Sequence, residues 1–64
     1  MIKSTFFTGF GFDPQSAMNN ANAQADTFIQ NGNGRRIEVS RTFINFNNNG
    51  SVYSASLQLN YSTQ

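Results

Sequence analysis

The sequence predicts a single α+β domain over residues 1–64, in which one helix packs on one face of a three-stranded antiparallel sheet. Apolar residues alternate with others from residue 2 to 12 and again from 52 to 61, which is the period of β-strands. Between them, residues 14–30 have apolar positions at helical spacing, and Asn47-Asn48-Asn49-Gly50 is a strong hairpin signal. The predicted order of elements is therefore strand, helix, strand, strand.

The first predicted strand, residues 2–12, has two faces of different character. Phenylalanine dominates one face and glycine recurs on the other, so we expect the phenylalanine-rich face to lie under the helix. The helix-facing positions would be Ile2, Phe6, Phe10 and Phe12, and the opposite positions Lys3, Thr5, Phe7, Gly9 and Gly11. On the opposite face, two glycines beside an aromatic ring either leave bare backbone for a flat ligand or another chain, or serve a strand that has to bend.

The predicted helix has clear boundaries. Asp13 can cap it, and Pro14 suits its first position, where no backbone N–H is needed. Its apolar side is narrow and mostly alanine, which would let it approach a sheet closely. The stretch Asn31-Gly32-Asn33-Gly34 ends it, because these residues tolerate the left-handed backbone of a helix C-terminus and turn.

The last two predicted strands, residues 35–46 and 52–61, pair through the hairpin. The first strand then takes the free edge of the third, which gives the sheet order 1-3-2. In the second strand the apolar parity set by Ile37 and Val39, and continued by Arg41, changes at Ile44. Either a bulge near Thr42 shifts the register, or both faces are covered there.

Length and composition favour an oligomer without cofactor, metal or catalytic activity. A chain of 64 residues forms a marginal core, and with no Cys and no His neither disulfides nor thiolate or imidazole metal sites can reinforce it. The three acids, Asp13, Asp26 and Glu38, are scattered, so neither acid–base catalysis nor a Ca²⁺ site is expected. We therefore expect a homo-oligomer, a dimer or larger, with Phe7, Ile44 and Phe46 uncovered.

Charge and targeting patterns set further expectations. The net charge is +1 and only 11% of residues are charged, which argues against nucleic acid as a partner. No stretch has the length of a membrane span, and the start MIKSTFF does not have the pattern of a secretory signal. We expect a cytoplasmic protein without a membrane partner.

The arginines suggest a ligand. Arg35 and Arg36 are either solvated strand-edge charges or phosphate contacts, because the guanidinium fork suits phosphate. Arg41 lies on the same face of its strand as Ile37 and Val39, so we expect its side chain in apolar surroundings. A charge that is partly buried there requires an anion, which could be Glu38, a C-terminal carboxylate of a neighbouring subunit, or a ligand. Gly9-Phe10-Gly11 is only a partial dinucleotide motif, because Pro14 stands where its third glycine belongs.

The predicted topology resembles the dodecins, small oligomeric flavin-binding proteins. The segments Met1-Ile2-Lys3, Phe7-Thr8-Gly9 and Tyr53-Ser54-Ala55 are similar to those of a group of small sporulation-type proteins. The chain has no Trp and so no counterpart of the dodecin flavin-stacking tryptophan, and no cofactor is expected. In being short, free of cysteine and rich in aromatic and amide residues, it also resembles small phage proteins that sequester nucleotide immune signals between subunits.

These expectations give two functional hypotheses. In the first, a non-catalytic homo-oligomer sequesters a small nucleotide-derived ligand, as a phage-encoded inhibitor of immune signalling would in the host cytoplasm. Its ligand-binding residues would be Phe7, Gly9, Gly11, Arg36, Arg41 and Tyr53. In the second, the chain is a structural or protein-interaction module of dodecin-like or sporulation type without a small ligand.

Overall fold

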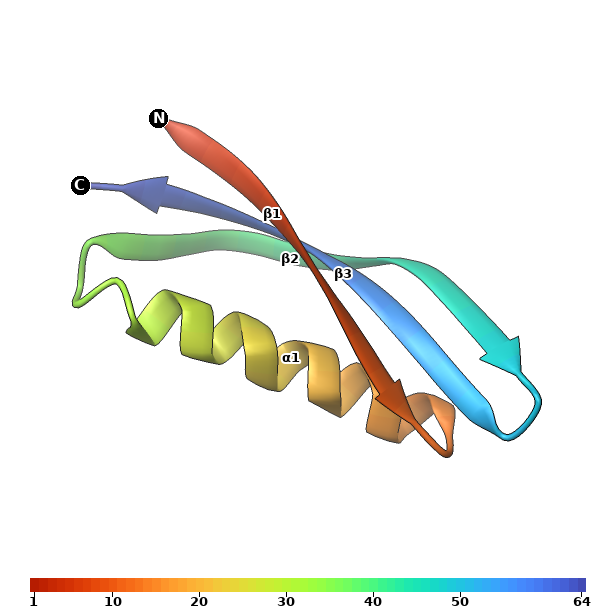
Figure 1. Ribbon diagram of the computed structural model, residues 1–64. Helices are drawn as coiled ribbons and strands as arrows, with labels where there is room; N and C mark the ends of the chain where they lie inside the picture. Colours follow the sequence, from red (N-terminus) through yellow and green to blue (C-terminus); the bar gives the residue numbers. More distant parts are fainter.

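The structure, a computed structural model that describes residues 1–64, has one helix and three strands in the order β1-α1-β2-β3. The elements are β1 (Ile2–Gly11), α1 (Pro14–Gln30), β2 (Arg36–Asn49) and β3 (Val52–Thr63). The strands form an antiparallel sheet in the order β1-β3-β2, and α1 covers one face of it (Figure 1). The predicted fold class and strand order are confirmed. We call the face under α1 the inner face and the opposite one the outer face.

Local sequence signals set the ends of α1 and the hairpin turn. Asp13 is the N-cap: its carboxylate accepts hydrogen bonds from the backbone N–H of Ser16 at 2.8 Å and from the Ser16 hydroxyl at 3.0 Å. Asn49 pairs with Val52, so the β2–β3 turn has two residues, and Gly50 has a φ of +68°. A positive φ at the first turn residue alone is typical of a type II′ turn, which favours glycine there.

The core is small and lies between α1 and β3. Its buried hydrophobic residues are Ala17, Ala21, Ala25, Ala55, Leu57 and Leu59. Three of them are the alanine stripe of the helix, so α1 lies close to the sheet. The helix packs mainly against β1 and β3 and has little contact with β2. The resulting molecule is thin, 42 × 18 × 12 Å.

The predicted orientation of β1 is wrong. Phe6 and Phe10 are on the outer face with exposed fractions of 60% and 62%, and Phe12, which follows the strand, is 81% exposed. Gly9 is buried instead, and a Cβ atom on it would overlap the carbonyl oxygen of Ala17. Because α1 approaches the strand this closely, only the glycine face of β1 fits beneath it.

Phe7 consequently belongs to the inner face. Its ring lies 5.6 Å from that of Phe28, which makes an edge contact with Tyr61 at 5.0 Å. Phe7 is therefore partly buried rather than uncovered, whereas Ile44 and Phe46 are exposed as predicted. These rings extend the core toward the C-terminal end of the helix.

Two register shifts interrupt β2, one between Glu38 and Ser40 and one between Phe43 and Asn45. The bulge predicted near Thr42 is thus confirmed, but as two bulges that flank it. Arg41 pairs with Leu59, so it lies on the inner face, while the bulged residues Val39 and Ile44 are about half exposed.

Candidate functional site

The most distinct hollow in the structure lies beyond the beginning of α1. The 17 residues of α1 span about 26 Å, whereas the 14 residues of β2 span about 40 Å with their two bulges, so the β2–β3 hairpin extends beyond the helix. Figure 1 shows the hairpin projecting past the first turn of α1. Its inner face is therefore uncovered near the turn.

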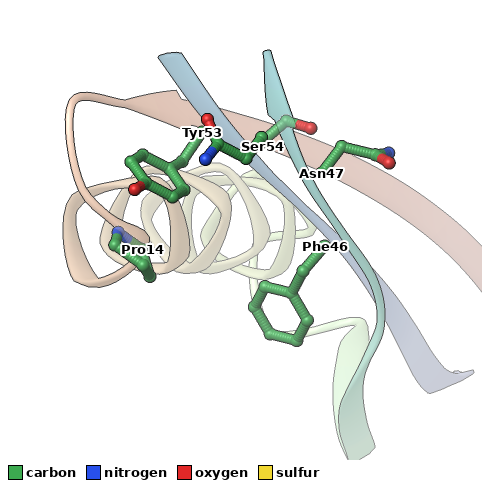
Figure 2. A pocket seen from close by; sticks show the side chains of 6 residues that line it. Pro14, Phe46, Asn47, Tyr53 and Ser54 are labelled. Carbon is green, nitrogen blue, oxygen red and sulfur yellow. The ribbon is translucent and has the colours of Figure 1, made fainter. Parts of the chain in front are cut away.

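A pocket of about 270 Å³ occupies this place. Tyr53 and Pro14 lie on one side of it and Phe46 on the other (Figure 2). Its lining residues are Pro14, Phe46, Asn47, Asn48, Tyr53 and Ser54. Pro14 is the first residue of α1, and the other five come from the two strands of the hairpin.

The register of the sheet explains how the pocket forms. Tyr53 pairs with Gly11 on one side and with Asn48 on the other, and Phe46 pairs with Ala55, which places these side chains on the inner face. Gly11 has no side chain, and a Cβ atom there would collide with Ser16, so the first turn of α1 can lie close to β1. Tyr53 and Phe46 then lie beyond the helix, where Tyr53 is partly buried and the Phe46 ring, about half exposed, lies 5.7 Å from that of Phe43.

The pocket is almost wholly apolar, and Phe46, Tyr53 and Pro14 supply its surface. Asn48 pairs with Tyr53, so its amide is on the inner-face side of the hairpin. Asn47 and Ser54 pair with each other and direct their side chains to the outer face, so they border the pocket with their backbones (Figure 2). No charged residue lines it. Small-molecule sites typically have this composition, a mostly apolar wall with a few polar groups.

Arg41 binds residues of its own chain rather than lining the pocket. Its guanidinium donates to Glu38, with Nε–Oε2 at 2.9 Å, to Asp26, with Nη2–Oδ1 at 2.9 Å, and to the Asn22 amide oxygen at 3.0 Å. Hydrogen bonds to Glu38, and then those to Asp26, raise the pKa of Arg41 above its ordinary value despite partial desolvation. Of the anions considered for Arg41, Glu38 is the one present, and Asp26 joins it.

Arg36 also has internal partners. Its guanidinium lies 4.0 Å from the centre of the Phe28 ring and donates to the Phe28 carbonyl oxygen at 2.6 Å. The contact covers the C-terminal end of α1, where backbone carbonyls have no helical partner. Arg36 therefore joins the helix end to β2.

The six predicted ligand residues do not gather around one cavity. Tyr53 lines the pocket, whereas Phe7, Gly9 and Gly11 are on the inner face beside α1, and Arg36 and Arg41 bind residues of the helix and of β2. The other pocket residues were missed, apart from Phe46, which was expected to be uncovered. The predicted lengths of the helix and the hairpin could have indicated these pocket residues, because a hairpin that is longer than the helix must extend past it.

The three acids have structural partners. Asp13 caps α1, and Asp26 and Glu38 both bind Arg41. The hydrogen bonds from the backbone N–H and the hydroxyl of Ser16 lower the pKa of Asp13.

The helix α1 does not have the length and apolar character that a membrane-crossing helix needs.

The outer face is a second feature of interest. Along β3 it presents a row of small polar side chains, and Asn60 of this row accepts from Ser4 at 2.6 Å and donates to Ser40 at 3.0 Å. Along β1 it presents Phe6 and Phe10. The face is thus polar in its middle and aromatic along one edge.

Comparisons of the chain with protein-family models, with curated proteins and with solved structures find no match.

Proposed function

We propose that the protein is a non-catalytic, homo-oligomeric binding subunit that holds a small, neutral, planar ligand of the nucleobase or nucleoside type. The observation that carries the proposal is the pocket of about 270 Å³ between the hairpin and the start of α1. It offers the rings of Phe46 and Tyr53 to a flat molecule, and Asn48 is the one amide with the same parity as these rings. Aromatic faces stack on any base, and an amide can bond to a base edge.

The charges of the chain narrow the ligand class. Arg36 and Arg41, which could have bound a phosphate, already donate to Phe28, Asp26 and Glu38. A phosphate on the ligand would gain little, because no cation lines the pocket. The pocket thus fits the base of a nucleotide-derived molecule rather than its phosphate. Sequestration of such a molecule requires binding and no catalytic group.

The exposed apolar surface supports self-association. Ten large hydrophobic side chains are exposed, while the largest fully buried side chains are only Leu57 and Leu59. A chain of this size with so small a core is marginal alone, and association with further copies would bury the exposed rings.

Binding can be tested by thermal shift and calorimetry with the four common nucleosides and their monophosphates. A ligand at a free concentration 100 times its dissociation constant should stabilise the protein by about 2.7 kcal/mol. Phe46→Ala removes one ring from the pocket and should weaken binding about 5- to 150-fold, because stacking on a base contributes about 1–3 kcal/mol. A nucleoside and its monophosphate should bind within a few-fold of each other.

Ile44→Ala is the matched control. Ile44 is exposed to the same extent as its neighbour Phe46, 51% against 53%, but does not line the pocket. It should leave nucleoside binding unchanged. If no nucleoside or base raises the melting temperature, or if the two variants weaken binding equally, the pocket does not have this function.

The exposed Phe6 and Phe10 favour a second candidate, a protein-interaction module without a small ligand. Here the outer face binds another folded protein. It predicts no stabilisation by any member of the nucleoside panel, and loss of partner binding in Phe10→Ser with the pocket intact.

A further inference from the structure

The two edges of the sheet differ in how they are protected. The β2 edge is interrupted by two bulges, which are known to hinder pairing with another strand. The β1 edge is ten residues long and pairs with β3 without a register shift. Lys3 is its only charged residue, and it contains no proline. A regular edge of this kind is open to a further strand.

A hydrogen bond from the helix shows which backbone groups face this edge. The side-chain amide of Gln24 donates to the carbonyl oxygen of Thr8 at 2.8 Å, so this carbonyl accepts a donor from outside the sheet. Alternate residues of a strand direct their backbone groups to the same side. The backbone groups of Ile2, Ser4, Phe6, Thr8 and Phe10 therefore face the free edge.

The side chains of these same five residues form a palindrome on the outer face. The order is apolar, hydroxyl, phenylalanine, hydroxyl, apolar: Ile2, Ser4, Phe6, Thr8 and Phe10. Two antiparallel copies centred on Phe6 would place Phe6 against Phe6, each hydroxyl against a hydroxyl, and Ile2 against Phe10. Cross-strand pairs of aromatic and β-branched residues are the ones that stabilise a sheet.

We propose that β1 pairs with β1 of a second copy about a two-fold axis through Phe6, which joins two sheets into one of six strands. The backbone N–H of Ser4 in the second copy then replaces the Gln24 amide at the Thr8 carbonyl. Lys3 lies opposite Gly9 of the second copy, so no like charges meet. The pairing covers Ile2, Phe6 and Phe10, which are otherwise exposed.

The helix leaves room for this pairing because it crosses the sheet diagonally. Its N-terminal half lies beneath β1 at Gly9 and Gly11. Farther along the helix, Gln24 and Phe28 still contact Thr8 and Phe7 of β1, while Asn22 and Asp26 contact Arg41 of β2. None of these contacts with β1 lies before Phe7, so the edge next to Ile2–Phe6 is free of them. In the antiparallel pair, this free segment of one copy faces the helix-covered segment of the other.

The inference deepens the self-association in the proposed function, but it does not depend on a ligand. The pocket residue Tyr53 pairs with Gly11, at the end of β1 away from Ile2, and its side chain is on the inner face. A dimer through the outer-face residues of β1 thus keeps the pockets accessible. Failure of dimerisation and failure of nucleoside binding can be measured separately.

The test uses charges placed on the two-fold axis. In Phe6→Glu, like charges would face each other and the aromatic pair would be lost, so the dimer dissociation constant should rise tenfold or more. Phe6→Lys should do the same, and an equimolar mixture of the two variants should dimerise more tightly than either variant alone, because Glu then faces Lys. Sedimentation velocity from about 10 µM to about 1 mM protein measures these constants.

Phe12→Glu is the matched control, since Phe12 is also an exposed phenylalanine but follows β1. It should dimerise like the wild type. A wild-type protein that stays monomeric at about 1 mM overturns the proposal, even if a foreign peptide binds the edge. It is also overturned if Phe6→Glu dimerises like the wild type, or if the Phe12→Glu control loses the dimer equally. A mixture of Phe6→Glu and Phe6→Lys that dimerises no more tightly than either variant alone overturns it as well. Nucleoside binding by a monomeric Phe6→Glu variant would leave the proposed pocket standing.

Discussion

Gly9→Ala is the most direct test of how closely α1 and β1 approach. Gly9 is buried, and a Cβ atom on it would overlap the carbonyl oxygen of Ala17 and the backbone nitrogen of Ala21, with the Ala21 Cα at 3.0 Å. All three atoms belong to the helix backbone, so no side chain can rotate away. Since carbon atoms pack best at about 3.5–4.0 Å, the helix must retreat by roughly 1 Å.

The cost of this retreat can be estimated. Overpacking a core typically costs about 1–3 kcal/mol, and contacts with rigid backbone argue for about 3 kcal/mol. The alanine also restricts the unfolded chain, which offsets about 0.4–1 kcal/mol, so the net loss should be about 2 kcal/mol. For 64 residues the total free energy of unfolding is about 3–10 kcal/mol, so this loss is a large part of it. In a domain of this size each kcal/mol shifts the melting temperature by about 4–8 °C, so the melting temperature should fall by roughly 10–15 °C.

Urea denaturation followed by circular dichroism, at one fixed protein concentration, measures this loss. Gly32→Ala is the comparison, because its Cβ atom would overlap the side chain of Arg36 rather than backbone, while the effect on the unfolded chain is the same. Arg36 can move at the cost of its contacts with Phe28, which the restricted unfolded chain partly offsets, so this variant should stay within about 1 kcal/mol of the wild type. If Gly9→Ala is as stable as Gly32→Ala, the close approach of helix and strand is refuted.

Two further predictions concern charged groups. The pKa of Asp13 is lowered in the folded protein, so its cap stabilises the fold above the ordinary aspartate pKa and this contribution is lost as the pH falls through the folded value. Asp13→Asn keeps a capping oxygen but has no titrating group at this position. The free energies of unfolding of wild type and variant, measured from about pH 6 to about pH 2, should therefore differ at about pH 6 and become equal at low pH. A difference that stays the same at every pH would contradict this. Arg41→Ala should lower the free energy of unfolding by about 1–2 kcal/mol, because it breaks the links of Glu38 and Asp26 to one guanidinium. Arg35→Ala, at an exposed position, should change it by less than about 0.5 kcal/mol, and equal losses in the two variants would count against the Arg41 network.

Local signals in the sequence determined the elements and their order. Asp13 and Pro14 mark the start of α1, and the asparagine run with Gly50 marks the hairpin. These residues act through their own backbone geometry and nearby hydrogen bonds, so they can be interpreted without knowing the fold. The sheet order followed because strands joined by a short turn pair, which leaves one edge for the first strand.

The candidate site was predictable only in part. Tyr53 was identified from the sequence, but Pro14, Asn47, Asn48 and Ser54 come together only because the hairpin extends beyond the helix. Arg41 was expected to meet an anion, and Glu38 was one of the alternatives. The bulge between Glu38 and Ser40 and the position of α1 decided that Glu38 and Asp26 share this role.

Only the tertiary structure decided which face of β1 lies inside. The sequence offers a phenylalanine face and a glycine face, and burial of apolar area alone favours the phenylalanines. The alanine stripe of α1 reverses this choice, because a helix with such small side chains comes within contact of the strand backbone and leaves room only for Gly9 and Gly11. That outcome depends on the distance between two elements, which alternation within one strand does not encode, and it leaves Phe6 and Phe10 on the surface.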